Sequence, residues 1–88
     1  MTEFHRHLDG NALGGMLEEV FGREMTAAAG TCSACGSVNA LGAAIAYTQA
    51  PGEVLRCPGC GIVLMVFVHR PDGYRITIGS IRCIQVAG

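Results

Sequence analysis

The chain has 88 residues and a formal net charge of −1. A protein of this length forms one domain and buries only about 60 per cent of the surface of its unfolded chain, so we expect an additional stabilising element. The charge argues against a nucleic-acid-binding protein, and the short apolar runs exclude a membrane span and a signal peptide.

The N-terminal part of the chain predicts a tail and a helix. We expect residues 1–8 to form a frayed tail. Over residues 9–22, apolar side chains recur at the spacing of one helix face, namely Leu13, Met16, Leu17 and Val20. Asp9 is expected to cap this helix and Gly22 to end it. Its apolar side either covers a β-sheet or docks on a partner. The stretch from Arg23 to Gly30 leaves a short helical turn and an extended connection both open.

Two matched Cys-X-X-Cys-Gly turns follow, ending at Gly36 and at Gly61. Two residues between cysteines let one tight turn direct both sulfurs at a single ion, and the glycine can take a positive φ. The spacing therefore predicts one metal site with four ligands, Cys32, Cys35, Cys57 and Cys60. Four sulfurs at tetrahedral angles favour Zn²⁺, with iron as the alternative.

Other roles for these cysteines fit the sequence less well. Disulfides or buried free thiols do not need a glycine after each second cysteine, and a c-type haem attachment needs a histidine where the chain has Gly36 and Gly61. A thioredoxin-like redox motif has a single Cys-X-X-Cys within a βαβ pattern. Thiolates persist for metal binding in a reducing compartment, which predicts a cytoplasmic protein. Four thiolates and one Zn²⁺ would bring the net charge to about −3.

Between the two turns the sequence predicts a hairpin. Residues 41–49 alternate as a strand, Pro51 and Gly52 fit a type II turn, and residues 53–56 return antiparallel to bring the second turn beside the first. We expect metal binding and folding to be coupled, because a structural zinc site supplies about 10–16 kcal/mol of apparent binding free energy.

The apolar run Ile62–Val68 predicts a strand that is apolar on both faces. A turn at residues 70–73, a half-buried strand at 74–78 and a last short strand at 80–86 follow. The N-terminal helix can cover one face of Ile62–Val68. The other face needs either the C-terminal segment or a second copy of the chain, so a homodimer through this strand face is a hypothesis.

Four further residues could carry metal or acid–base chemistry. His5 and His7 fall on the predicted tail, and His69 is expected in a surface turn with no carboxylate nearer than Asp72. Cys83 is expected to be a small buried apolar residue, with a fifth sulfur near the metal site as the alternative. We predict no catalytic residue, because four cysteines close the coordination shell that a catalytic zinc keeps open.

The two turns, the hairpin between them and the strand after Cys60 resemble the zinc-ribbon superfamily over residues 31–78. The expected fold class is α+β, a zinc ribbon with a small antiparallel sheet and an N-terminal amphipathic helix. More narrowly, both turns together with three runs resemble a small family of uncharacterised proteins from GC-rich bacteria, a domain of unknown function. The runs are Leu8-Asp9-Gly10-Asn11-Ala12-Leu13, Glu19-Val20-Phe21-Gly22 and Ile81-Arg82-Cys83. This resemblance spans nearly the whole chain and implies a stand-alone zinc ribbon, with the same four cysteines as ligands and no activity.

Three functions remain open. The first is a structural zinc ribbon that binds a protein partner or a second copy through the Ile62–Val68 strand face. The second is a nucleic-acid-binding ribbon, for which Arg56, Arg70, Arg75 and Arg82 are the candidate contacts. The third is an electron carrier, because the two turns also resemble the iron site of rubredoxin. The chain departs from rubredoxin in lacking tryptophan, in the shorter gap between the turns and in the N-terminal helix.

Overall fold

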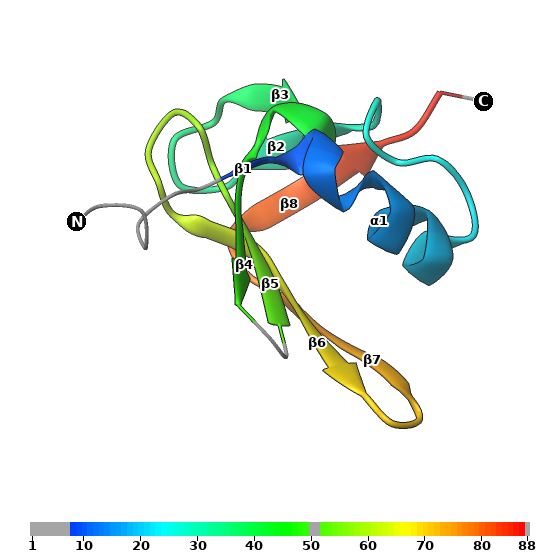
Figure 1. The fold of residues 1–88 in the computed structure, drawn as a ribbon. Helices are drawn as coiled ribbons and strands as arrows, with labels where there is room; N and C mark the ends of the chain where they lie inside the picture. The colour runs from blue at the N-terminus through cyan, green and yellow to red at the C-terminus, as the bar shows by residue number, and fades with distance from the viewer. Residues whose placement is uncertain (1–7, 50–51, 88) are drawn as a thin grey trace.

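A computed structural model describes residues 8–49 and 52–87, which form an α+β fold with two antiparallel sheets (Figure 1). The five-stranded sheet has the order β1-β4-β5-β6-β7, with bounds Leu8–Asp9, Ile45–Gln49, Gly52–Arg56, Val63–Arg70 and Gly73–Ile78. The three-stranded sheet has the order β3-β2-β8, with bounds Val38–Ala40, Ala29–Cys32 and Ile81–Gln85. Among the described residues, no helix has the length and apolar character needed to cross a membrane.

The N-terminal helical segment starts later than the sequence predicts. Asp9 belongs to β1, where it pairs with Ile45, and its side chain makes no capping hydrogen bond. A 3₁₀ helix, Gly10–Leu13, comes next, and the α-helix α1 spans only Gly14–Phe21. The expected cap is wrong because the pairing with β4 holds this residue in a strand. The end is as expected: Gly22 has φ 77° and donates its N–H to the carbonyl oxygen of Glu18 at 2.8 Å.

The hairpin between the cysteine turns is present. β4 and β5 pair antiparallel from Ile45 with Arg56 to Gln49 with Gly52. The predicted strand over 41–49 begins only at Ile45, because a 3₁₀ helix, Leu41–Ala43, occupies its first residues. Gly52 is the first residue of β5 and does not have a positive φ, so it does not take the third position of a type II turn. Pro51 lies outside the described residues.

The two faces of β6 have different surroundings. Met65 and Phe67 are fully buried on the face that α1 covers, and the ring of Phe67 meets that of Phe21 edge to face, with centroids 6.4 Å apart. Leu17 of α1 is also fully buried. Val66 and Val68 lie on the opposite face and are only half-buried. The prediction that the N-terminal helix covers one face of this strand is confirmed.

The C-terminal strand pairs with β2 and not with β6. Ala29 of β2 lies opposite Gln85 of β8, so β8 belongs to the three-stranded sheet. Leu64, which shares the second face of β6 with Val66 and Val68 by alternation along the strand, is only 6% exposed and belongs to the hydrophobic core, so the face is covered at its Leu64 end and partly open at Val66 and Val68. We call its accessible part the open face; by the register of the strands its side chains are Asp9, Ile45, Tyr47, Val54, Arg56, Val66, Val68, Arg70, Arg75 and Thr77.

Candidate metal centre

The two cysteine turns have the same backbone geometry. The first connects β2 to β3, and the carbonyl oxygen of Cys32 accepts the N–H of Gly36 at 2.9 Å. The second connects β5 to β6, and the carbonyl oxygen of Cys57 accepts the N–H of Gly61 at 2.8 Å. Gly36 and Gly61 have φ values of 79° and 81°. The prediction that both glycines take a positive φ is confirmed, and glycine suits these positions because it has no Cβ.

The sulfur atoms of the two turns form one group, and each of the four lies within 4.8 Å of the others. Cys32 Sγ lies 3.8 Å from Cys60 Sγ, and Cys35 Sγ lies 3.7 Å from Cys57 Sγ. A regular tetrahedron with metal–sulfur bonds of about 2.3 Å has edges of about 3.8 Å. Two edges already have this length, so the four cysteines could hold one metal ion after a contraction of at most about 1 Å along the others.

Each turn supplies one buried and one exposed cysteine. Cys32 and Cys57 are 2% and 0% exposed, and both pack with the hydrophobic core, whereas Cys35 and Cys60 are on the surface. The first turn extends from the three-stranded sheet and the second from the five-stranded sheet. An ion bound by all four sulfurs would therefore connect the two sheets at the edge of the core.

A serine that the sequence pattern did not identify contacts this group. Ser37 Oγ lies 3.1 Å from Cys35 Sγ and 3.4 Å from Cys57 Sγ. The side-chain amide of Asn39 donates to Ser37 Oγ at 3.2 Å, so the hydroxyl hydrogen is left to point at a sulfur. The pKa of Cys57 is lowered to about 6, chiefly by the hydrogen bond with Ser37 and further by the backbone N–H groups of Cys60 and Gly59, and the hydrogen bond with Ser37 is also the main cause that lowers the pKa of Cys35. The only sequence signal was a hydroxyl residue directly after Gly36.

The pKa of Cys60 shifts in the opposite direction. The backbone N–H of Ile62 lowers it, but partial desolvation and the neighbouring thiols of the group outweigh this effect and raise the pKa of Cys60 to about 11. The lowered pKa of Cys57 and the raised pKa of Cys60 mean that, without a metal, the Cys57 thiol ionises first and its charge disfavours ionisation of the Cys60 thiol. A bound cation removes this repulsion.

His69 is not part of the sulfur group. Its Nε2 lies 2.7 Å from Glu53 Oε1 on the neighbouring strand β5, and its ring centroid lies 4.7 Å from that of Tyr74. The expectation that Asp72 is its nearest carboxylate is wrong, because strand pairing brings Glu53 beside it. The side chain is exposed, as expected. His5 and His7 lie outside the described residues.

Cys83 is exposed and does not join the sulfur group, so the expectation that it is buried is wrong. The cause is an irregularity in the pairing of β8 with β2, where the register shifts between Thr31 and Cys32. Ile81 is buried before the shift and Ile84 is half-buried after it, which leaves Cys83 facing solvent.

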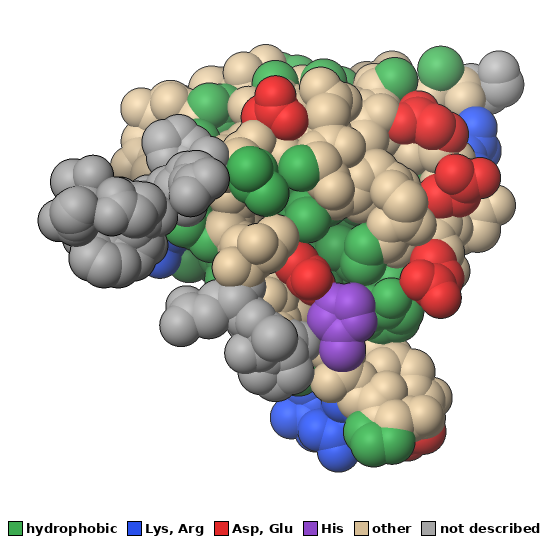
Figure 2. Space-filling view, in the orientation of Figure 1, with side chains coloured by type: hydrophobic (Ala, Val, Ile, Leu, Met, Phe, Trp, Pro, Cys, Tyr) green, Lys and Arg blue, Asp and Glu red, His purple; other side chains and the backbone are tan. Residues whose placement is uncertain are grey.

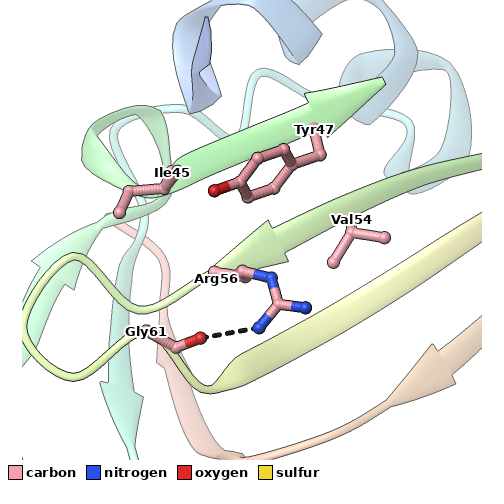
Figure 3. A pocket seen from close by; sticks show the side chains of 5 residues that line it. All are labelled: Ile45, Tyr47, Val54, Arg56 and Gly61. Atoms are coloured by element: carbon pink, nitrogen blue, oxygen red, sulfur yellow. Dashed lines mark hydrogen bonds between the residues drawn. The ribbon is translucent and has the colours of Figure 1, made fainter. Parts of the chain in front are cut away.

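A pocket of about 470 Å³ lies beside the second cysteine turn, on the open face (Figure 3). It is lined by Ile45, Tyr47, Val54, Arg56 and Gly61. Nη1 of Arg56 donates to the carbonyl oxygen of Gly61 at 2.8 Å, and the guanidinium carbon lies 5.7 Å from the centroid of the Tyr47 ring. The sequence predicted Arg56 only as a nucleic-acid contact.

One protein family matches residues 3–88 of the chain, and its description is a family of unknown function, DUF6510. No curated protein and no solved structure matches. The match agrees with the whole-chain resemblance to a domain of unknown function. It assigns neither a metal nor an activity to the four-cysteine group.

Proposed function

We propose that this chain, which belongs to the family of unknown function DUF6510, is a non-enzymatic zinc-binding protein of the zinc-ribbon type. The ligands are the four thiolates of Cys32, Cys35, Cys57 and Cys60. The observation that carries the proposal is the spacing of their sulfur atoms, two of whose separations, 3.7 and 3.8 Å, equal the edge of a tetrahedral zinc–thiolate site.

The chemistry of this donor set supports a structural role. A catalytic zinc has three protein ligands and keeps a fourth position open for water or substrate. Four cysteines fill all four positions. The cation would connect the two sheets, and a small core gains from such a connection, since a domain of this size has only a narrow margin of stability. The function then lies in the surface that the zinc-stabilised fold presents to another protein, in a compartment that keeps thiols reduced.

Two other readings of the site make different predictions. A rubredoxin-like electron carrier would use the same four sulfurs with iron, and sulfur separations alone do not distinguish the two metals. A nucleic-acid-binding ribbon would use Arg56, Arg70 and Arg75, which β5, β6 and β7 carry on one side of the five-stranded sheet. The net charge of −1, about −3 with zinc bound, opposes that reading.

The test is the metal content of freshly purified, untagged protein, measured by mass spectrometry together with its visible absorption spectrum. We expect one zinc per chain and no colour. Cys57→Ser should lose the metal, whereas Cys83→Ser, which changes an exposed cysteine outside the group, should keep it. Bound iron, detected by visible charge-transfer bands, would refute the zinc proposal and favour an electron carrier. A chain without metal, or zinc retained by Cys57→Ser, would refute the ligand set.

A further inference from the structure

We propose that the pocket between Tyr47 and Arg56 binds an acidic segment of a partner protein, with a carboxylate on Arg56 and an apolar side chain against Ile45 and Val54. This inference deepens the proposed function, because it names the surface and the class of partner. It rests on the proposed function at one point, since Gly61, which holds Arg56, belongs to the second cysteine turn.

Arg56 is oriented for a carboxylate before any ligand arrives. A guanidinium has five N–H donors in a planar fork, and the bond to Gly61 uses one of them. The ring of Tyr47 fixes the group from the other side. Arg56 forms no ion pair with any described residue, so its charge is available. A fixed planar fork binds a carboxylate through two parallel hydrogen bonds at a small cost in side-chain entropy.

The walls of the pocket suit an apolar side chain next to that carboxylate. Figure 3 shows Ile45 and Val54 on the same side of β4 and β5 as the Tyr47 ring and the Arg56 guanidinium. Tyr47 is 37% exposed, so part of its ring is accessible to a ligand. The volume of about 470 Å³ lies within the range of about 300–1,000 Å³ that is usual for ligand pockets. The pocket is open toward solvent, so it suits part of a segment that lies across the surface.

The combination of apolar side chains and an arginine occurs again along the open face, away from the pocket. Val54 pairs with Val66, and Val68 pairs with Arg75, so an apolar strip leads across β6 to a second arginine on the edge strand β7. Arg75 is exposed and forms no ion pair with a described residue. An extended segment lying along this strip would meet a positive charge at each end.

The distribution of charge selects an acidic partner. Carboxylates gather on the side of the molecule that carries α1 and the connection to β2 (Figure 2), namely Glu18, Glu19 and Glu24, with Glu53 on the helix-covered face of β5. Among the described residues, the sheet register places only one carboxylate on the open face, that of Asp9 at its edge. Arg70, at the end of β6, lies 4.0 Å from Asp72 in the turn. Arg56 and Arg75 therefore keep their positive charges beside an apolar strip.

Other occupants match this face less well. A symmetric dimer through the open face would bring Arg56 and Arg75 of one copy toward the same arginines of the other, which places like charges together. Single-stranded nucleic acid is bound by several stacking aromatic side chains along a groove of many cations. Among the residues that the structure describes, the open face has one exposed aromatic ring, that of Tyr47, and the net charge of the whole chain is −1.

The experiment is an amide NMR titration of the zinc-loaded, ¹⁵N-labelled protein with two peptides. The first is acetyl-Glu-Leu-Asp-Phe-Glu-amide, and the second replaces its acids by Gln, Asn and Gln. Zinc content and spectral dispersion are checked first, so that a failed metal site is recognised separately from a failed pocket. We expect saturable shifts at Tyr47, Val54 and Arg56 with the acidic peptide, and binding weaker by about tenfold or more for the neutral peptide.

Two variants and a control locate the binding. Arg56→Gln should weaken binding of the acidic peptide by about tenfold, and Arg75→Gln by about threefold, because it removes a more exposed contact. Arg75→Gln also keeps the proposal testable if Arg56→Gln disturbs the cysteine turn. Arg82→Gln, which changes an exposed arginine of the other sheet, should leave the affinity unchanged.

Four results would overturn the proposal. They are equal affinity for the two peptides, shifts that map to α1, no saturable shift up to about 1 mM peptide, and tighter binding of a single-stranded oligothymidylate than of the acidic peptide. The last result would assign the open face to nucleic acid. A fifth result, sedimentation of the free protein as a dimer that Arg56→Gln stabilises, would assign the open face to a second copy.

Discussion

Replacing Ser37 by alanine removes a hydroxyl group from the metal centre without changing any of its four cysteines. Ser37 Oγ lies 3.1 Å from Cys35 Sγ and 3.4 Å from Cys57 Sγ, and the bond from Asn39 leaves its single hydrogen for a sulfur. A hydrogen bond to a charged acceptor contributes about 1.5–3 kcal/mol. At about 1.4 kcal/mol for each factor of ten, Ser37→Ala should raise the dissociation constant for Zn²⁺ by about 10–100-fold.

The assay is competition for zinc with a chromophoric chelator at neutral pH, read from the absorbance of the chelator complex. Ser33→Ala is the matched control, because Ser33 lies in the same cysteine turn and its side chain forms no hydrogen bond with a described residue. We expect the control to bind zinc within about twofold of the unchanged protein. If Ser37→Ala weakens zinc binding no more than Ser33→Ala, with both variants folded in zinc, the role assigned to this hydroxyl is wrong.

Three further predictions concern the stability of the fold. Removing zinc with a chelator should reversibly unfold both sheets, because about 10–16 kcal/mol of binding free energy exceeds most of a stability margin of about 5–15 kcal/mol; dispersed amide signals in excess chelator would contradict this. Gly61→Ala should destabilise the zinc-loaded protein by about 1–2 kcal/mol, since its φ is 81°. Gly15→Ala should stabilise the zinc-loaded protein by about 0.5–1 kcal/mol, because Gly15 lies in α1 with open space around a new Cβ. The measurement is denaturant unfolding, and changes of the same sign in the free energy of unfolding for Gly61→Ala and Gly15→Ala would refute this reasoning. The hydrogen bond from Tyr74 to Glu19 raises the pKa of Tyr74 above its usual value of 10.0, so its contribution to stability is present below pH 10 and is lost as pH rises through the raised value. Glu19→Gln should lower the pKa of Tyr74 toward its usual value in an ultraviolet titration of the phenolate, and an unchanged midpoint for Tyr74 would count against the bond.

The features that the sequence predicts correctly are encoded within a few neighbouring residues. Each cysteine turn needs only its own two cysteines and the glycine that follows, so the positive φ at Gly36 and Gly61 can be inferred from the spacing alone. The same holds for Gly22, which ends α1 in the left-handed region. The hairpin of β4 and β5 follows because both strands lie between two turns that have to meet.

The features that it missed depend on segments that meet only in the folded chain. Asp9 would cap a helix if no strand lay beside it, but β4 pairs with it. The sequence predicts a buried Cys83, but the register shift between β2 and β8 turns it outward; His69 has a carboxylate partner because β5 places Glu53 beside it. Ser37 contacts a sulfur of each cysteine turn, and the turn that carries Cys57 extends from the five-stranded sheet, not from the sheet next to Ser37. Strand order and register set all four contacts, and neither can be read from local pattern.

The second cysteine turn contributes both to the four-cysteine group and to the pocket. The N–H of Gly61 closes the turn on Cys57, while its carbonyl oxygen holds Arg56 on the open face. A turn that loses its shape when zinc leaves can no longer fix this guanidinium, so the acidic segment should bind tightly only to the zinc-loaded chain, although none of the four ligands lines the pocket. Because coupling between two binding sites is reciprocal, an acidic segment that fixes Arg56 should in turn raise the affinity of the chain for zinc.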